Sequence, residues 1–423
     1  MDSIEKRINP STISGTISAP PSKTIMNRAL IAAFLSESPT ILSNPSFSED
    51  SQIALNLIQA LGAYVRIHPN EIYIRGEMNP TGEILNCGQS GSILRLFTPV
   101  AALFQERLTL TGNGRLFAAP VSRMEAALHS LGAQFRSTDG SCPVTVTGPL
   151  TGGPLSMDGS SDPSLVAGLL MALPKAHGDS TLRIGNPNGI PPVAITLKVL
   201  NDFGIRIDQT DYAVFSIPGD QPYRLKNNKH QYRIEGEWKG AAFMMVAGAI
   251  GGSVSLTGLN CLSIQSDKKI LNALTSAGAD VSLSNHQITI KKNKLQAFAF
   301  DAASCPGLFP PLTVLACNCT GLSTINGVHR LIQKGNDRSR KLQQLILSLG
   351  GQARIQGDTM EIAGTPLKGG LVYSHDDPRI AMAAAIAAIN AENSVTIHNY
   401  HCVTQSYPNF FTDLQKIGAN IYC

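Results

Sequence analysis

The chain has 423 residues, of which 43% are hydrophobic and 15% charged, and its formal net charge at pH 7 is only +4. A chain of this length exceeds one ordinary hydrophobic core, so the length favours two domains. The small net charge argues against general nucleic-acid binding, and no apolar run is long and charge-free enough to span a membrane. The eight cysteines are scattered without a CxxC pair, which indicates neither a zinc site nor a disulfide framework. The N-terminal residues include no apolar segment typical of a secretory signal, so we expect a cytoplasmic protein.

The stretch from Pro20 to Leu30 combines two prolines, a helix cap and two cations. The prolines cannot continue a helix, whereas Ser22 and Thr24 can cap the first turn of the apolar run that follows. Lys23 and Arg28 then lie where unpaired N–H groups and the helix dipole favour an anion. The stretch therefore predicts a phosphate or carboxylate site. The alternative is a capped surface helix with two solvated cations.

One pattern recurs six times: an apolar helix that ends at a glycine, then a strand, a turn and a second strand. The glycines of the six copies are Gly62, Gly132, Gly204, Gly278, Gly350 and Gly418. Each stands where a helix end requires a positive φ. Two sets of three copies predict two similar domains, with the very apolar segments 240–250 and 380–389 buried as helices. Paired strands favour mixed or antiparallel sheets, and a conventional doubly wound α/β protein is the alternative.

The domain change is expected near residues 234–237, after the polar segment 226–230. The strand predicted at 12–18 is expected to pair with the second domain, because Pro20-Pro21 makes a natural crossover.

The Pro20–Leu30 motif, the six-copy repeat and several later motifs resemble the EPSP synthase (3-phosphoshikimate 1-carboxyvinyltransferase) family over essentially the whole chain. The resemblance implies an α/β enolpyruvyl transferase fold, an inside-out α/β barrel with two domains of three βαβαββ units each. The domains would be 20–234, and 1–19 plus 235–423, closing on substrate through hinges near 19–21 and 232–237. It also implies a cytoplasmic monomer without cofactor or metal, whose partner is a small anionic substrate and neither a nucleic acid nor a membrane.

Site residues are implied where this sequence matches the family motifs, in the cleft between the domains. For phosphoenolpyruvate (PEP) or a similar anion the positions are Lys23, Gly91, Arg115, Arg338 and Arg379. For the second substrate they are Thr24, Arg28, Ser164 and Lys334. Guanidinium groups suit carboxylate and phosphate oxygens because their geometry allows bidentate contact. A glycine such as Gly91 lets a phosphate approach the backbone.

The sequence departs from the family pattern at the acid–base positions. Gly307 stands where the family has a catalytic Asp, Gly335 where it has a catalytic Glu, and Gln405 where it has a Lys. Pro378 replaces the His that precedes the last arginine. Because glycine has no titratable group, the catalytic residues of this chain are left unassigned.

The pocket for shikimate 3-phosphate departs as well. The family's Ser-Ser-Gln is here Asp162-Pro163-Ser164, and its Ser-Lys-Pro-Tyr is here 189–192, Gly-Ile-Pro-Pro. A carboxylate repels a phosphate, and proline removes a backbone donor.

Three hypotheses remain open. The favoured one is a repurposed enzyme that keeps the anion site and acts on a shikimate-like or other phosphorylated or carboxylated cyclic substrate. A second is a functional 3-phosphoshikimate 1-carboxyvinyltransferase with displaced catalytic groups, for which Asp301, Asp337 and Asp376 are candidates. The third is a non-catalytic paralogue that binds a small anion or a protein.

Overall fold

The computed structural model describes residues 5–118, 120–158, 162–187, 190–226, 230–284, 287–333 and 336–422. The chain divides into two compact units, unit 1 (Met1–Pro20 with Glu235–Cys423) and unit 2 (Pro21–Ile234). Each unit has its own cluster of buried hydrophobic side chains. That the two crossovers between the units act as hinges stays a prediction.

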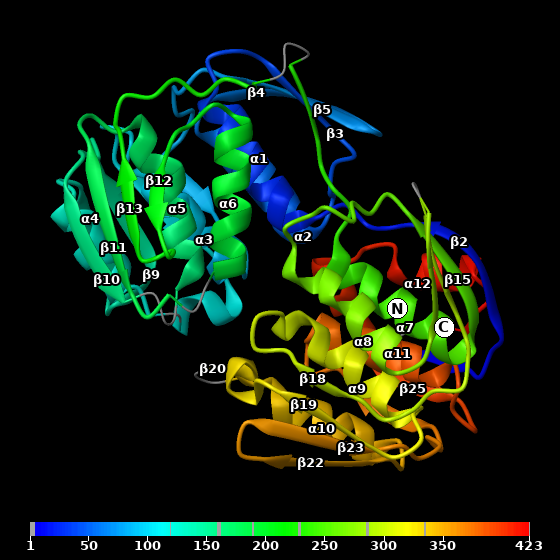
Figure 1. The fold of residues 1–423 in the computed structure, drawn as a ribbon. Helices are drawn as coiled ribbons and strands as arrows, with labels where there is room; N and C mark the ends of the chain where they lie inside the picture. The colour runs from blue at the N-terminus through cyan, green and yellow to red at the C-terminus, as the bar shows by residue number, and fades with distance from the viewer. Residues whose placement is uncertain are drawn as a thin grey trace. The chain divides into compact units, whose positions relative to one another are not determined.

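Within its described residues, unit 2 contains three four-stranded sheets with one common arrangement (Figure 1). In each sheet the first two strands are parallel and the other two join them antiparallel. In sheet order the strands are β14 (Gln231–Arg233), β3 (Thr40–Ser43), β5 (Glu71–Gly76) and β4 (Ala63–His68); β6 (Ile84–Asn86), β7 (Leu108–Thr111), β9 (Ser141–Thr147) and β8 (Gln134–Thr138); β10 (Pro154–Asp158), β11 (Ser180–Gly185), β13 (Val214–Ile217) and β12 (Asp208–Thr210).

The described part of unit 1 repeats this arrangement in three further four-stranded sheets. Starting from the parallel pair, the strands are β24 (Gly370–Tyr373), β25 (Val395–His398), β1 (Glu5–Asn9) and β26 (Asn420–Tyr422); β2 (Ile13–Ser18), β15 (Gly252–Thr257), β17 (Gln287–Lys291) and β16 (Asp280–Leu283); β18 (Ala299–Asp301), β19 (Leu322–Asn326), β23 (Thr359–Ala363) and β22 (Gln352–Gln356). A small hairpin joins β20 (Ile332–Gln333) to β21 (Asn336–Asp337). The mixed sheets show that the doubly wound alternative is wrong.

Buried helices form the centre of unit 2. Its inner helices are α1 (Lys23–Leu35), α3 (Gly91–Ala101) and α5 (Pro163–Ala172). Its outer helices are α2 (Glu49–Ala60), α4 (Ser122–Ser130) and α6 (Ile190–Asp202), and its short 3-10 helices are η1 (Gly114–Ala118) and η2 (Leu173–Lys175). Nearly every residue of α1 and α5 is buried; α5 is apolar on all sides, whereas α1 buries Asn27 and Arg28 together with its apolar residues. The alternative of a surface helix after Pro21 is therefore wrong.

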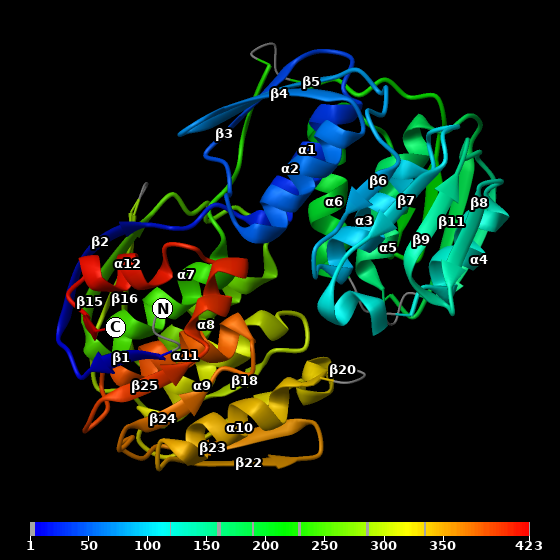
Figure 2. The same ribbon diagram turned by 180° about the vertical axis from the view of Figure 1, so that it is seen from behind.

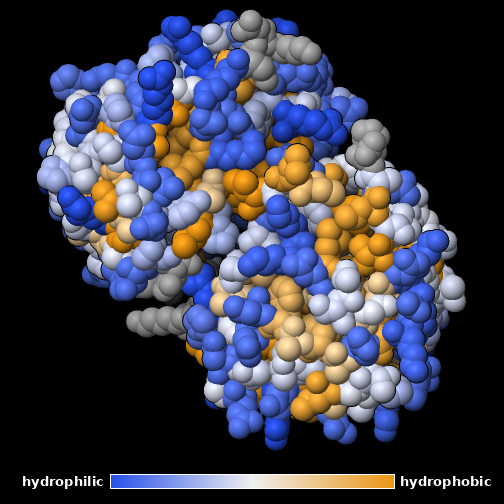
Figure 3. Space-filling model, in the orientation of Figure 1, coloured by the Kyte–Doolittle hydropathy of each residue, from blue (hydrophilic) through white to orange (hydrophobic). Residues whose placement is uncertain are grey.

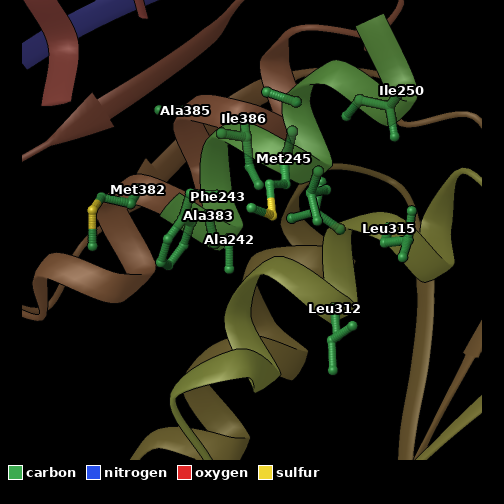
Figure 4. Close-up of a cluster of buried hydrophobic side chains, with 14 of the residues drawn as sticks. Ala242, Phe243, Met245, Ile250, Leu312, Leu315, Met382, Ala383, Ala385 and Ile386 are labelled. Carbon is green, nitrogen blue, oxygen red and sulfur yellow. The ribbon is translucent and has the colours of Figure 1, made fainter. Parts of the chain in front are cut away.

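Unit 1 has the same plan, with α7 (Trp238–Gly251), α9 (Phe309–Cys317) and α11 (Pro378–Ala388) inside. Figure 4 shows Phe243 and Met245 of α7 near Ile386 of α11, with Leu312 and Leu315 on α9. Seen from both sides, the sheets lie around these helices (Figures 1 and 2). The other helices are α8 (Ile270–Ser276), α10 (Arg338–Ser348), α12 (Phe410–Lys416), η3 (Ser266–Lys269), η4 (Pro306–Leu308), η5 (Val328–Leu331) and η6 (Tyr400–Gln405).

The predicted repeat is confirmed by its glycines. All six have positive φ, from 80° at Gly204 and Gly350 to 105° at Gly62. The predicted crossover strand is confirmed too, because β2 pairs in parallel with β15 of unit 1. The apolar segments predicted at 240–250 and 380–389 are the buried helices α7 and α11.

Figure 3 shows hydrophilic and hydrophobic residues mixed over the face that it draws. Among the helices in the described ranges, none is both long and apolar enough to cross a lipid bilayer. The same ranges bring together no group of three or more His, Cys, Asp or Glu side chains that could hold a metal ion.

Candidate functional site

The start of α1 carries the first predicted cations of unit 2. Ser22 is its N-cap, and the Ser22 Oγ accepts a hydrogen bond from the Ile25 N–H at 3.5 Å. Lys23 Nζ lies 2.8 Å from Oδ2 of Asp50, in the first turn of α2. Lys23 therefore has a carboxylate partner supplied by the chain.

Arg28 is a buried cation of a different kind, only 6% exposed. Its Nε donates to Thr196 Oγ1 at 2.7 Å and its Nη1 to the Thr24 carbonyl at 2.9 Å. Among the described residues no carboxylate pairs with it, and burial lowers the pKa of Arg28 to about 10. The neighbouring Asn27 has a buried Oδ1 that accepts no hydrogen bond from the described residues. A buried charge without a counter-ion is costly, so Arg28 suits an anionic ligand.

The space next to Gly91, the first residue of α3, is occupied by the Arg95 side chain of the same helix. A Cβ on Gly91 would lie 2.8 Å from Nη1 of Arg95, and that Nη1 donates to the Gly91 carbonyl at 3.0 Å. The space above Gly91 is thus used by Arg95.

Arg95 in turn binds the carboxylate of Asp162. The distance from Arg95 Nε to Asp162 Oδ2 is 2.6 Å, with the two side chains 19% and 11% exposed. Asp162 is also the N-cap of α5, where its Oδ1 accepts from the Leu165 N–H at 3.1 Å and Pro163 takes the first helical position. Burial raises the pKa of Asp162, although Arg95 opposes this. Ser164 follows on the first turn of α5 and is half-buried.

In unit 1, the starts of α10 and α11 are joined by an ion pair. Arg338 Nε lies 2.6 Å from Oδ2 of Asp377, the N-cap of α11, whose Oδ1 accepts from the Arg379 N–H at 3.0 Å. The nearby Arg338 charge and burial lower the pKa of Arg379. In the described part of the chain no group accepts a hydrogen bond from the Arg379 guanidinium. Two adjacent guanidinium groups that share the Asp377 carboxylate suit a further anion, although the charges of Asp267 and Glu237 also act on Arg379.

A second group of charges surrounds Gly307, in η4. A Cβ on Gly307 would lie 2.8 Å from both Asp267 Oδ1 and the Lys239 Cδ. Lys239 Nζ is 3.4 Å from Oε1 of Glu237, the N-cap of α7. Asp267, on η3, is a titratable group that the sequence interpretation missed. No local pattern relates it to position 307, since the two are separated by α8 and the strands that follow.

The three carboxylates proposed as displaced catalytic groups are otherwise engaged or exposed. Asp301 is exposed and its Oδ1 accepts from the Ala303 N–H at 2.9 Å. Asp337 is the N-cap of α10 and pairs with Arg340 at 3.3 Å. Asp376 is exposed, with a φ of 54°.

Some predicted positions cannot be placed. Lys334, Gly335 and Gly189 lie outside the described residues. Arg115 belongs to η1, of which only the backbone is described at this position. Gln405 ends η6 and is half-buried.

Comparison with known proteins assigns both the fold and the family. The fold matches an EPSP synthase structure from Acinetobacter baumannii with a TM-score of 0.87 at 22% identity, covering 99% of this chain and 100% of that one. It also matches the enolpyruvyl transferase NikO from Streptomyces tendae with a TM-score of 0.77 at 18% identity, over 99% and 98% of the two chains. The predicted enolpyruvyl transferase fold is therefore confirmed.

The sequence comparisons are more specific. A family model described as EPSP synthase (3-phosphoshikimate 1-carboxyvinyltransferase) matches residues 8–414. A protein of Clostridium novyi (strain NT) named 3-phosphoshikimate 1-carboxyvinyltransferase is 32% identical over 429 residues, covering 98% of each chain. The chain belongs to the EPSP synthase family.

Proposed function

We propose that this chain is a repurposed enzyme of the EPSP synthase family. It keeps an anion site of the PEP type and acts on a cyclic acceptor other than shikimate 3-phosphate, either a shikimate-like ring or another ring that carries an acidic group. The ion pair between Arg95 and Asp162 is the observation that carries this proposal.

Asp162 supports the change of acceptor by charge and by geometry. The family resemblance implies neutral hydroxyl and amide ligands for shikimate 3-phosphate in the Asp162–Ser164 segment. Here the Asp162 carboxylate lies 2.6 Å from Arg95 Nε and neutralises the charge of that guanidinium. A dianionic phosphate would have to displace that carboxylate or lie beside it, and both cost free energy at short range.

Each unit has an arginine that favours an anionic ligand. Arg28 is buried without a carboxylate among the described residues, and Arg379 lies beside the like charge of Arg338. A phosphate or carboxylate bound at either arginine would relieve the cost of that arrangement. The pairing of Asp162 with Arg95 therefore favours a changed acceptor, and Arg379 beside Arg338 favours a retained site for an anionic donor.

A second candidate is ordinary 3-phosphoshikimate 1-carboxyvinyltransferase activity with a displaced acid–base group. Its support is Asp267, whose Oδ1 would lie 2.8 Å from a Cβ at position 307. The name of the Clostridium novyi relative agrees with this candidate.

Two assays on the purified full-length protein distinguish the candidates. The first measures phosphate release and EPSP formation from PEP and shikimate 3-phosphate, and we expect no turnover. Turnover at the rate of a family synthase assayed in parallel would overturn the proposal in favour of the second candidate.

The second assay measures the melting temperature with PEP, inorganic phosphate and a matched concentration of chloride. A ligand that binds the folded state at 100 times its Kd stabilises by about 2.7 kcal/mol. We expect PEP and phosphate to raise the melting temperature and chloride to leave it unchanged. No shift with millimolar PEP would remove the anion site from the proposal and favour a non-catalytic paralogue that binds a protein.

A further inference from the structure

Unit 1 places a carboxyl group and an amine where Gly307 has no side chain. The Asp267 Oδ1 and the Lys239 Cδ would each lie 2.8 Å from a Cβ at this position, and the Lys239 Cγ 3.0 Å from it. Contacts below 3.0 Å are too short for a Cβ, so any larger residue at 307 would have to move both side chains. Gly307 is therefore needed for the present positions of Lys239 and Asp267.

Two carboxylate oxygens in this cluster are buried without a hydrogen bond within the described part of the chain. Asp267 Oδ1 and Glu237 Oε1 are both shielded from solvent, and neither accepts a hydrogen bond from the described residues. Lys239 Nζ, at 3.4 Å from that Glu237 oxygen, forms an ion pair without hydrogen-bond geometry. A buried polar atom left without a hydrogen bond is destabilising, because it has given up its hydrogen bonds to water. A proton on the carboxyl group, or a ligand that donates to it, would remove this destabilisation.

The titratable groups around Asp267 come from three parts of unit 1. Lys239 and Glu237 face it from the start of α7, Arg379 from α11, and the Cys305 thiol from the loop before η4. Burial raises the pKa of Asp267, Lys239 and Arg379 lower it, and Glu237 raises it further. Burial and then the Asp267 charge raise the pKa of the Cys305 thiol to about 12, so this thiol stays protonated and does not compete as a base.

We propose that Asp267 is the proton-donating carboxyl group of the anion site in unit 1, and that Lys239 stabilises the carboxylate left after the proton is transferred. Arg379 lies in the same electrostatic cluster and supplies the cation for the ligand. The ligand class is a small phosphorylated or carboxylated enol, for which PEP is the probe. This inference rests on the proposed function, because it takes the retained PEP-type anion site as its starting point.

The proposed step is a single proton transfer. The proton leaves the Asp267 carboxyl group, and the electron pair of the ligand's C=C bond forms the new C–H bond at the methylene carbon. The positive charge develops on the oxygen-bearing carbon, which an acceptor hydroxyl can then attack. The negative charge remains on Asp267, whose Oδ1 would lie 2.8 Å from a Cβ at position 307, and the Lys239 charge stabilises it.

Proton uptake during PEP binding tests the proposal. An anion bound beside Asp267 disfavours its carboxylate, so binding should draw a proton from solution. Isothermal titration calorimetry of full-length protein with PEP, from pH 5.5 to 8.5 in buffers of different ionisation enthalpy, measures this uptake. Titration of the PEP phosphate itself contributes equally to every variant, so the difference between variants isolates Asp267.

Three variants give the expected pattern. Asp267→Asn should lose the uptake and bind PEP about tenfold more tightly at high pH, the change that one pKa unit represents. Lys239→Met should bind PEP more weakly by about the same factor. Asp280→Asn is the matched control, because Asp280 is exposed on β16 and is not a member of this cluster, and it should behave as the wild type.

The outcomes distinguish failure of the role of Asp267 from failure of the proposed anion site. PEP binding with the same proton uptake in Asp267→Asn as in the wild type would overturn the role of Asp267 and leave the anion site intact. Absence of PEP binding to the wild type would overturn both. If Asp267→Asn does not fold, lack of pH-dependent uptake in the wild type, or unchanged affinity in Lys239→Met, overturns the proposal without that variant.

Discussion

Replacing Asp162 with serine should convert an internally neutralised arginine into a phosphate site. Serine is as good an N-cap as aspartate, so the first turn of α5 keeps its cap. What is lost is the carboxylate 2.6 Å from Arg95 Nε. Asp162→Ser therefore measures the effect of the ion pair alone, without the effect of losing the N-cap.

The magnitude follows from the burial of the pair. Removing one partner of a fully buried ion pair costs about 3–5 kcal/mol, whereas exposed pairs contribute about 0–1 kcal/mol. Because these side chains are 19% and 11% exposed, we expect a cost of about 2–3 kcal/mol. For a unit of this size each kcal/mol lowers the melting temperature by about 2–4 °C, which gives a decrease of roughly 4–12 °C.

Scanning calorimetry and fluorescence-monitored melting, with and without phosphate, measure the effect. Phosphate should restore much of the lost stability in Asp162→Ser, because it replaces the missing anion at Arg95, and should restore less in Asp162→Ser/Arg95→Met. The double-mutant cycle then gives the coupling between the two side chains. A decrease below about 1 °C, or equal responses to phosphate in both variants, would refute the proposed ion pair and its role in excluding phosphate.

Backbone geometry, a buried cation and an ion pair give further testable outcomes. Gly62→Ala should lower the free energy of unfolding in urea by more than Gly140→Ala does. A Cβ on Gly62 would lie 2.4 Å from a backbone oxygen, whereas one on Gly140 meets nothing within 4 Å, so Gly140→Ala bears only the left-handed strain of about 1–2 kcal/mol. Equal losses in the two variants would contradict this. Arg28→Met should reduce the stabilisation by inorganic phosphate while changing the intrinsic melting temperature little, and an unaltered phosphate response would count against a role for Arg28. Burial alone would raise the pKa of Asp377, but Arg338 holds the pKa of that carboxyl below its ordinary value. The ion pair therefore stabilises the fold above the pKa that Asp377 has in the unfolded chain, and this stabilisation is lost as the pH falls through the lower pKa of the folded state. Arg338→Met should therefore flatten the acid limb of a melting-temperature profile, and parallel limbs would show that the pair contributes nothing.

The fold could be predicted because its signals are local. Positive φ at Gly62 or Gly350 depends on one residue and the helix end before it, and the sequence shows both. The burial of α7 and α11 likewise follows from helices that are apolar on every side. Six copies of such signals sufficed to predict mixed sheets in two similar units.

The charge pairs could not be predicted in this way, because each depends on which helix ends meet. Arg95 lies on the second turn of α3, and Asp162 is the N-cap of α5, which packs against α3. From the sequence, Asp162 appeared to be a charge that repels a ligand. In the structure it is the counter-ion of a neighbouring arginine. Asp267 had no sequence signal at all, since its relation to Gly307 exists only across packed elements.

The cations of this chain differ in where their counter-charge comes from. Lys23 and Arg95 are paired with carboxylates of their own unit, so the folded protein needs no ligand to neutralise them. Arg28 lacks a carboxylate partner among the described residues. Arg379 lies next to Arg338, and no described group accepts a hydrogen bond from its guanidinium. A ligand gains binding free energy only from charges that the protein has not already neutralised. Substitution of one serine-type position by Asp162 can therefore remove affinity for a phosphorylated acceptor while leaving the affinity for an anionic donor unchanged.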